Sequence, residues 1–410
     1  MNYVIIGNGV AGVMAAEAIR QLDPEGKLTM IGDETFDPYC RPMISLVLDG
    51  STEPDKLPIR KASFYEDMRI EPVLGDRVTS IDVDNKTVSI RADRAISYDK
   101  LLIATGADPR PIKAERLDLK NIFYMRTEAQ VRKMLEGLAQ AKKALVLGGG
   151  LVGFKAAYGL LRRGLQVTML IRSDHPLSMQ VDERAGKMIL DELIAHGLEV
   201  RVGVEVTAFE GNHQVRSAHL SDDREIPCDM VIIGKGVLPA LSFVPRDKIE
   251  VDLGIMVDRF METSVPGIFA AGDVAEWIDV ARNTRWVNAI WPEAVTQGRI
   301  AGTNMAGRAV AYQGSLSRNV IRIFGLDVMA GGLVKPPSND RYTVVSSMDR
   351  RRKTYRKLVF SDDRLVGMVM VNGVEQGGIL LSLMHGQIPV KVPHEILLQT
   401  SFNFRQLMRS

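Results

Sequence analysis

Two glycine-rich loops of the same form constrain the fold of this chain more than any other feature. Their glycines are Gly7, Gly9 and Gly12 in the first loop, and Gly148, Gly150 and Gly153 in the second. Each loop has G-x-G-x-x-G spacing and follows a short apolar run, residues 3–6 and 144–147, typical of a buried parallel strand. A helix is expected after each loop, over residues 13–20 in the first case. One such loop is weak evidence, but two between the same flanking elements are not expected by chance.

The spacing has a physical reason that applies to nucleotides. The first glycine allows a tight turn, the second lets the backbone approach a pyrophosphate, and the third lets the helix pack close on the strand. The helix then directs its free N–H groups and positive dipole end at the phosphates. An acidic residue about 20 positions further on would bind the ribose hydroxyls. Asp33 and Glu34 stand there, after the next apolar run, and Asp33 is favoured.

Composition sets wider limits. The chain has 410 residues, of which 46% are hydrophobic and 25% charged, enough for two or three globular domains. A net charge of +2 is too mild to predict a nucleic-acid partner. An apolar strand is expected from residue 3, which argues against a signal peptide, and no apolar run approaches the roughly 20 residues of a membrane span. We therefore expect a cytoplasmic protein without a membrane span.

The cysteines and histidines predict neither a disulfide framework nor a metal site. The two cysteines, Cys40 and Cys228, are far apart in the sequence, which favours a reducing compartment. The six histidines show no ligand spacing on a common element.

Two further segments indicate how the domains are arranged. Residues 101–110 form an apolar strand that runs into Ala104, Thr105 and Gly106. Residues 265–277 form another, which runs into Gly272 and Asp273. Together with the two loops, in this order, the segments resemble the flavoprotein family with two dinucleotide-binding domains that includes the pyridine nucleotide–disulfide oxidoreductases. The resemblance covers the motif order to about residue 320 and is looser beyond.

The resemblance implies an α/β fold with two Rossmann-like domains. An FAD domain, residues 1–108 and 240–318, would be interrupted by an NAD(P) domain, residues 109–239. The tail, 319–410, would be an α/β interface domain, in a homodimer or a subunit of a larger complex. Its strand-like runs are 343–347, 356–360 and 365–371, followed by a helix over 375–386.

The resemblance also implies FAD on the first loop and NAD(P)H on the second, with hydride passing between nicotinamide and flavin N5. Asp273 would contact the ribityl chain of the flavin. The residues expected to bind the two cofactors are Gly7, Gly9, Ala11, Gly12, Asp33, Glu34, Arg41, Pro42, Ala104, Thr105, Gly106, Gly148, Gly150, Leu151, Val152, Gly153, Arg172, Gly236, Gly272, Asp273 and Ala294.

The stretch PYCRPMIS, residues 38–45, bears on the chemistry. Disulfide reductases of the family carry a C-x-x-x-x-C pair, and Cys40 has no such partner. The stretch instead resembles the PYxRPxLS signature of the ferredoxin, rubredoxin and nitrite reductase flavoproteins, which pass electrons from NAD(P)H through FAD to a one-electron centre without a thiol. Arg41 would contact the FAD phosphates or the flavin edge, and Pro42 would begin a helix.

Two alternatives stay open. A stand-alone NAD(P)H oxidase or thiol-type reductase would use Cys40 as a sulfenate or mixed disulfide, although Cys40 is about one turn from the position that the single-cysteine branch uses. A flavoprotein that signals through binding would turn over slowly.

Departures from the family pattern suggest how the flavin is tuned. Relatives carry a Glu after the second loop that pairs with an early Lys, whereas this chain has Lys155 and Leu46 at those positions. We hypothesise that Lys155 lies near flavin N5 and stabilises its reduced form. A helix over 291–307 would place Glu293, Ala294 and Gln297 near the flavin pyrimidine ring. Lys155, Arg41 and Glu293 are thus the predicted catalytic residues.

The choice between NADH and NADPH stays open. Ile171 stands where NADH enzymes carry an acid, and Arg172 suits a 2′-phosphate, but Asp174 would repel one and Ser178 stands where a second Arg is usual. No iron–sulfur cysteines are present, so any cluster belongs to a partner protein. The cationic segment 348–357 is a candidate docking site for an acidic partner. The sequence does not set the direction of electron flow.

Overall fold

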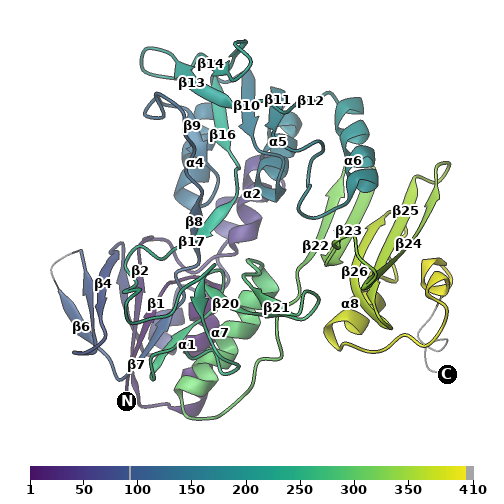
Figure 1. Cartoon of the computed structure of the whole chain (residues 1–410). Coiled ribbons are helices and arrows are strands. Elements are labelled where there is room, and N and C mark those ends of the chain that lie inside the picture. Colours follow the sequence, from purple (N-terminus) through teal and green to yellow (C-terminus); the bar gives the residue numbers. More distant parts are fainter. Residues whose placement is uncertain (92–93, 403–410) are drawn as a thin grey trace.

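Two parallel sheets and one antiparallel sheet organise the chain (Figure 1). The computed structural model describes residues 1–91 and 94–402. The first sheet has the strand order β19-β7-β1-β2-β3 and is parallel throughout. Its strands are β1 (Asn2–Ile6), β2 (Lys27–Gly32), β3 (Ile70–Leu74), β7 (Lys100–Ile103) and β19 (Ile268–Ala270). The predicted apolar runs form its buried centre, as parallel strands covered on both faces require.

The second sheet repeats this architecture with the order β12-β11-β10-β16-β9. Its strands are β9 (Ile122–Tyr124), β10 (Lys143–Leu147), β11 (Gln166–Ile171), β12 (Glu199–Val202) and β16 (Met230–Ile233). The helices of this domain are α4 (Glu128–Leu138), α5 (Leu151–Arg162) and α6 (Glu183–Ala195). The predicted fold class, with two Rossmann-like domains, is confirmed.

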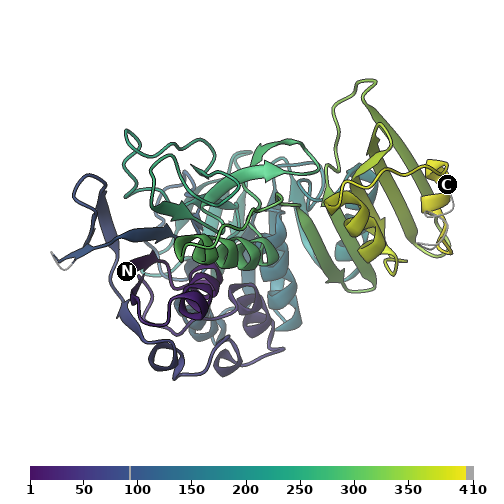
Figure 2. The same cartoon turned by 90° about the horizontal axis from the view of Figure 1, so that it is seen from below.

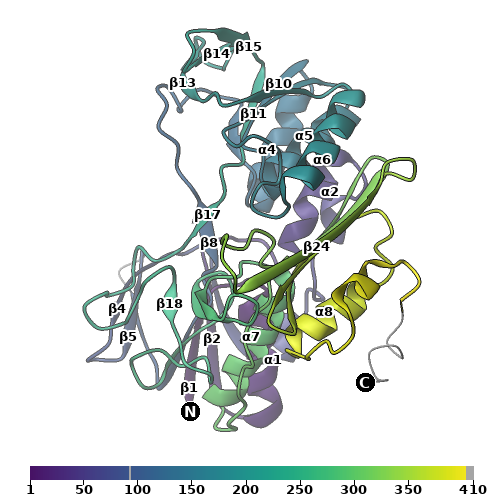
Figure 3. The same ribbon diagram turned by 45° about the vertical axis from the view of Figure 1, so that its right-hand side comes forward.

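A short strand pair carries the chain between the two sheets. Strand β8 (Ala107–Pro109) leaves the first domain and pairs antiparallel with β17 (Val237–Pro239), on which the chain returns. Figure 3 shows this pair at the waist between the domains. The remaining small strands are β4 (Val78–Asp82), β5 (Thr87–Ile90), β6 (Ala95–Ser97), β13 (Val206–Glu210), β14 (Ser217–Leu220), β15 (Glu225–Pro227), β18 (Ile255–Met256), β20 (Ala275–Asp279) and β21 (Thr284–Trp286). The remaining helices before the C-terminal domain are the short α2 (Ile44–Asp49) and α3 (Phe64–Asp67), and the 3-10 turns Arg41–Met43 and Pro54–Lys56.

Helices α1 (Val10–Leu22) and α7 (Trp291–Met305) lie side by side under the first sheet (Figure 2). Their close approach depends on glycine, because a Cβ added to Gly298 or Gly302 would lie 2.2 Å or 2.3 Å from a backbone oxygen of α1. Helix α1 extends beyond the predicted 13–20, and α7 begins at the predicted residue. This packing joins the two halves of the first domain, which are far apart in sequence.

The C-terminal domain is an antiparallel sheet of order β22-β23-β26-β25-β24. Its elements are β22 (Arg318–Ile323), β23 (Leu326–Gly332), β24 (Tyr342–Asp349), β25 (Thr354–Ser361), β26 (Arg364–Val371), α8 (Gly377–His385) and the 3-10 turn His394–Leu398. The three predicted strands and the helix are confirmed. Strands β22 and β23 were not predicted, because β22 mixes charged and apolar residues and β23 ends in two glycines.

One face of this sheet joins the core of the second domain, where Ile323, Val328 and Val369 share a cluster with Phe154 of α5 and Leu48 of α2. The other face is covered by α8 (Figure 3). None of the described helices combines the length and apolar character needed to cross a bilayer.

The α1–α7 contact can be tested by filling it. Gly302→Val should lower the free energy of unfolding by about 1–3 kcal/mol, because the added side chain has no space beside Ala15. Gly378→Ala in α8 is the matched control, since nothing lies within 4 Å of its Cβ position. Denaturant unfolding of both variants checks this, and equal stabilities would contradict it.

Candidate functional site

A cavity of about 670 Å³ lies where the first sheet, α5 and β22 meet. Most of the predicted cofactor residues line it: Gly7, Gly9, Ala11, Asp33, Glu34, Arg41, Pro42, Ala104, Thr105, Gly106, Leu151, Val152, Lys155, Gly272, Asp273 and Ala294. The tertiary structure therefore brings residues from both glycine loops to one space.

Other predicted residues lie outside the lining of this cavity. Gly12 has a packing role, because a Cβ there would lie 2.1 Å from the carbonyl oxygen of Gly7. Gly148, Gly150, Gly153 and Gly236 belong to the second domain, as does the exposed Arg172. Glu293 is buried behind the cavity wall.

Both glycine loops have the free space and donors that a dinucleotide needs. Gly7 has a φ of +123°, and a Cβ there would lie 2.1 Å from the carbonyl oxygen of Ala104. At Gly9 and Gly150 an added Cβ would meet nothing within 4 Å, so the backbone is open to a ligand. The cavity and its loops therefore fit FAD on the first loop.

The helices after these loops begin without a side-chain cap. Gly9 and Gly150 are the N-caps of α1 and α5, and neither helix has an acid in its first turn. By contrast, α4 and α6 are capped by Thr127 and Asp182. The uncapped N–H groups remain available to phosphate oxygens.

Two predicted cavity residues are already paired with each other. Arg41 donates to Glu34 at 2.6 Å and to the carbonyl oxygen of Arg126 at 2.8 Å. Glu34 also accepts a 2.9 Å hydrogen bond from the Tyr39 hydroxyl. Asp33 is exposed and lines the cavity. The guanidinium of Arg41 thus has a carboxylate partner within the protein.

Arg126 lines the cavity and was missed by the sequence analysis. Its Nη2 lies 3.1 Å from Oδ2 of Asp273, and its Nε donates to the Ala107 carbonyl oxygen. Arg126 directly precedes the capping box of Thr127 and Gln130, a sequence pattern that marks the start of α4. Nothing in the sequence links it to Asp273, 147 residues away.

Helix α7 positions a second missed arginine. Arg318 of β22 lines the cavity and donates to Glu293 at 2.6 Å, and Tyr312 also hydrogen-bonds Glu293. Gln297 accepts a 2.8 Å hydrogen bond from the Gly272 N–H. Glu293 and Gln297 thus hold residues that line the cavity.

Lys155 projects from α5 and lines the cavity, and no ion pair or hydrogen bond of its side chain is found among the described residues. Burial lowers the pKa of its amine, and the nearby Cys40 partly opposes this shift. Leu46 is 38% exposed and lies outside the lining.

Both cysteines favour the thiol form. Burial raises the pKa of Cys40, against smaller opposite effects of the Met43 N–H and Lys155. Burial, with the charge of Asp229, raises the pKa of Cys228 to about 12. Neither cysteine is among the residues that line the cavity. Within the described ranges, no group of three His, Cys, Asp or Glu could hold a metal ion.

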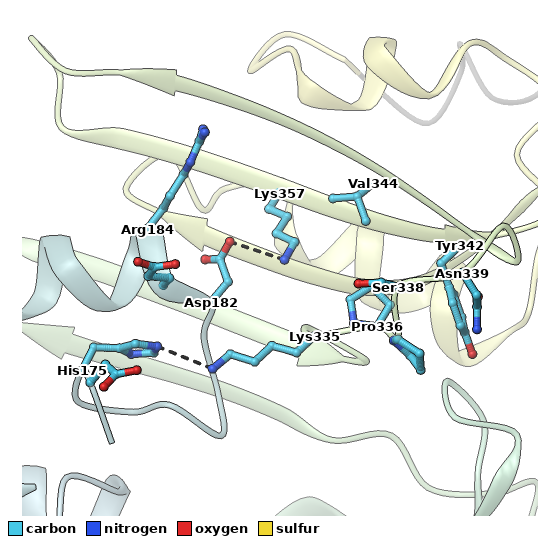
Figure 4. Close-up of a pocket in the computed structure, with 13 residues that line it drawn as sticks. His175, Asp182, Arg184, Lys335, Pro336, Ser338, Asn339, Tyr342, Val344 and Lys357 are labelled. Atoms are coloured by element: carbon cyan, nitrogen blue, oxygen red, sulfur yellow. Dashed lines mark hydrogen bonds and ion pairs between the residues drawn. The ribbon is translucent and has the colours of Figure 1, made fainter. Parts of the chain in front are cut away.

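A second cavity, of about 620 Å³, lies between residues 174–184 and the C-terminal sheet (Figure 4). Lys335 reaches His175 at 3.5 Å, and Lys357 lies 3.4 Å from Asp182. Asp182 also accepts a 2.7 Å hydrogen bond from Tyr355. These contacts attach the segment after β11 to the C-terminal domain.

Two parallel α/β domains whose glycine loops meet at one cavity define a protein that binds two dinucleotides. The chain belongs to the pyridine nucleotide-disulphide oxidoreductase family, whose model matches residues 1–298. The rubredoxin NAD+ reductase C-terminal domain matches residues 318–388. Membership of this family indicates FAD and NAD(P)H as cofactors.

Relatives extend this similarity. Nitrite reductase [NAD(P)H] of Bacillus subtilis is 28% identical over 395 residues, which cover 96% of this chain but 48% of that protein. This chain therefore spans about half the length of that relative. The benzene 1,2-dioxygenase system ferredoxin–NAD(+) reductase subunit of Pseudomonas putida is 36% identical over 279 residues, covering 67% of this chain and 68% of that one.

A solved structure agrees with these relatives. The covalent complex of putidaredoxin reductase with putidaredoxin matches with a TM-score of 0.89 and 25% identity, covering 99% of this chain and 98% of that one.

The Arg126–Asp273 pair can be tested through cofactor retention. Arg126→Met should raise the dissociation constant for FAD about tenfold, because an unpaired carboxylate would remain beside the cofactor cavity. Equilibrium titration of the apoprotein with FAD measures the effect. Arg69→Met, which removes an exposed pair with Glu25, is the control. Equal FAD affinities of the two variants would refute the assignment.

Proposed function

We propose that this chain is an FAD-dependent oxidoreductase that passes electrons between NAD(P)H and an iron–sulfur or similar one-electron carrier protein, without a redox disulfide. The observation that carries this proposal is the single cavity lined by the first glycine loop, by Leu151 and Lys155 of α5, and by β22. The segments proposed to bind the flavin, the nicotinamide nucleotide and the carrier thus line the same cavity. The names of the matched C-terminal domain and of the ferredoxin reductase relative support the carrier class.

The domain assignment forms part of the proposal. We assign residues 1–108 and 240–318 to FAD, 109–239 to NAD(P)H and 319–410 to an interface domain. The β8–β17 crossing lies at both internal boundaries, which supports them. The half-length match to the nitrite reductase supports a second form of the proposal, in which the chain is the NAD(P)-facing subunit of a larger complex. A cytoplasmic location is also part of the proposal, because two cysteines without a disulfide fit a reducing compartment.

Bound FAD would supply the step between two-electron and one-electron chemistry, accepting hydride at N5. The chain's own residues bind and orient it. The first loop and the α1 N-terminus would hold the pyrophosphate, Asp33 the ribose, and Asp273 the ribityl chain. The second loop would bring the nicotinamide against Leu151 and Lys155. Glu293 would act as a positioning residue, because it holds Arg318 in the cavity wall.

Strand β22 is the better candidate for the carrier surface than the cationic hairpin turn. The turn joins β24 to β25, but Nζ of Lys353 lies 3.2 Å from Oε2 of Glu192 of α6. Strand β22 lines the cavity itself, and Val320 on it is 66% exposed. A carrier docked at β22 would therefore lie close to the cavity proposed for the flavin. This favours β22, because electron transfer requires a short path.

The proposal is tested by purifying the untagged chain from its own cells and recording its visible spectrum and co-purifying subunits. Flavin bands, bleaching by NAD(P)H, and rapid reoxidation by an added ferredoxin or rubredoxin would support it. A co-purifying cysteine-rich subunit with an iron–sulfur spectrum would support the larger complex. Rapid reoxidation by oxygen alone would favour the oxidase alternative and contradict the proposal.

Cys40 provides a direct test of the thiol alternative. Cys40→Ala should reduce the carrier at a rate within about twofold of that of the wild-type protein. The reason is that the thiol is neutral and lies outside the cavity lining. Steady-state reduction of a one-electron carrier measures this. A loss of activity with retained flavin binding would show that the thiol takes part in the reaction.

Lys155 should raise the flavin potential. In Lys155→Met, loss of about 1.4 kcal/mol of stabilisation of the reduced form would lower a two-electron potential by about 30 mV. Redox titration of the flavin measures it, with Lys187→Met, on the exposed face of α6, as the control. An unchanged potential would refute the role.

The difference in flavin potential between the wild-type protein and Lys155→Met should also depend on pH. Because burial lowers the pKa of Lys155, its charge is lost at a lower pH than that of an exposed lysine. This difference in potential should therefore decrease as the pH rises through the pKa of Lys155, because the amine loses its charge.

A further inference from the structure

An ion pair and a third charged residue follow the strands of the second sheet at its carboxyl edge. Nζ of Lys235 lies 2.8 Å from Oε1 of Glu205, although the two residues follow different strands, β16 and β12. Arg172 directly follows β11, whose last residue pairs with the last residue of β12, and Gly203 donates to the Ile171 carbonyl oxygen at 2.8 Å. Arg172 and Glu205 therefore leave adjacent strand ends.

This group of charges stands beside the second glycine loop. A Cβ added to Gly148 would lie 3.3 Å from the backbone nitrogen of Lys235. A Cβ added to Gly149 would lie 2.6 Å from the side chain of Ile171. The loop is thus flanked by Lys235 on one side and by the end of β11 on the other. In Rossmann-like domains the ribose nearest the adenine lies at this edge, beyond the second strand.

Glu205 is a half-exposed anion paired with Lys235. Its hydrogen bond to Lys235 and the charge of Lys235 hold its pKa below the usual range, against a smaller effect of burial, and Arg172 adds to the lowering. Its side chain is nevertheless 52% exposed, whereas that of Lys235 is 21% exposed. The carboxylate can therefore turn into solvent, while the ammonium stays beside the loop.

We propose that Arg172 and Lys235 form a two-cation site for the 2′-phosphate of NADPH, and that Glu205 occupies this site as a counter-ion until the phosphate replaces it. A phosphate carries more charge than a carboxylate and has three acceptor oxygens, so it can bind both cations at once. NADH has no group that replaces Glu205, and Ile171 offers its ribose hydroxyls no acceptor. The site therefore selects NADPH. This inference rests on the proposed binding of NAD(P)H to the second loop.

The neighbouring acid Asp174, two residues beyond Arg172, lines the second cavity together with Lys335. Leu177 donates to the carbonyl oxygen of Gly149 at 2.6 Å, which holds the segment after Arg172 against the loop. Backbone hydrogen bonds of Ile171 and of Leu177 therefore fix the chain before and after Arg172.

The inference is tested by flavin reduction in the holoenzyme. The unchanged protein should be reduced with a higher second-order rate constant by NADPH than by NADH. Arg172→Met and Lys235→Met should each lower the constant for NADPH about tenfold or more and change that for NADH less than about twofold, because each removes one phosphate contact. Glu205→Gln should raise the constant for NADPH, since the competing anion is gone.

Two matched controls separate these effects from general charge changes. Lys187→Met removes an exposed cation of α6, and Glu210→Gln removes an exposed carboxylate paired with His219. Neither should alter the ratio of the two constants. A preference for NADH that Glu205→Gln weakens would mean that Glu205 binds the ribose hydroxyls, and would overturn the inference. Unchanged ratios in all three site variants would also overturn it.

Failure of the proposed function is distinguished by a binding measurement. Calorimetric titration with adenosine 2′,5′-bisphosphate and with ADP needs no electron transfer. Tighter binding of the 2′,5′-bisphosphate, lost in Lys235→Met, would support the two-cation site even if neither coenzyme reduces the flavin. Equal binding of both probes would overturn the site whether or not the flavin is reduced.

Discussion

The close approach of glycine backbone to neighbouring backbone is the constraint on which the rest of the structure depends. At Gly7, Gly148 and Gly153 an added Cβ would lie within 2.4 Å of a carbonyl oxygen, so each loop turns directly from its strand into its helix. The helices α1 and α5 therefore begin at the loops with unbound N–H groups. The same principle joins α7 to α1 through Gly298 and Gly302, and so brings the N-terminus of α7 to the cavity.

Three arginines at the cavity are paired with carboxylates. Arg41 binds Glu34, Arg126 binds Asp273, and Arg318 binds Glu293 behind the wall. Each arginine has a planar fork that suits a carboxylate, and each pair is at least partly buried, so the partners fix one another. Lys155 differs from them, because no pairing of its amine is found among the described residues. An uncompensated cation in a partly buried cavity favours an electron-rich cofactor, and this is the physical basis of its proposed role.

The C-terminal domain contributes more than an interface. One face of its sheet shares a core with α5 and α2, and its Tyr355, Lys357 and Lys335 bind the segment that follows β11. Strand β22 at its edge lines the cavity beside the first glycine loop. The domain therefore supports the walls of both cavities, and its position would constrain where the proposed carrier protein approaches.

The sequence by itself determined the two parallel α/β domains, since G-x-G-x-x-G spacing between an apolar strand and a helix has few other structural solutions. It also predicted the residues of the first loop, the Gly272–Asp273 turn and the β24–β26 strands, because their signals are local. Strands β22 and β23 escaped prediction, since their residues take their partners from the rest of the sheet.

The tertiary structure alone decided the pairs Arg126–Asp273, Arg318–Glu293 and Lys235–Glu205, and the burial that keeps both cysteines as thiols. The members of each pair come from different elements or loops, which meet only when the sheets have formed. Local sequence patterns carry no information about such contacts, because these depend on how distant elements pack, within the second domain for Lys235–Glu205 and between domains for Arg126–Asp273.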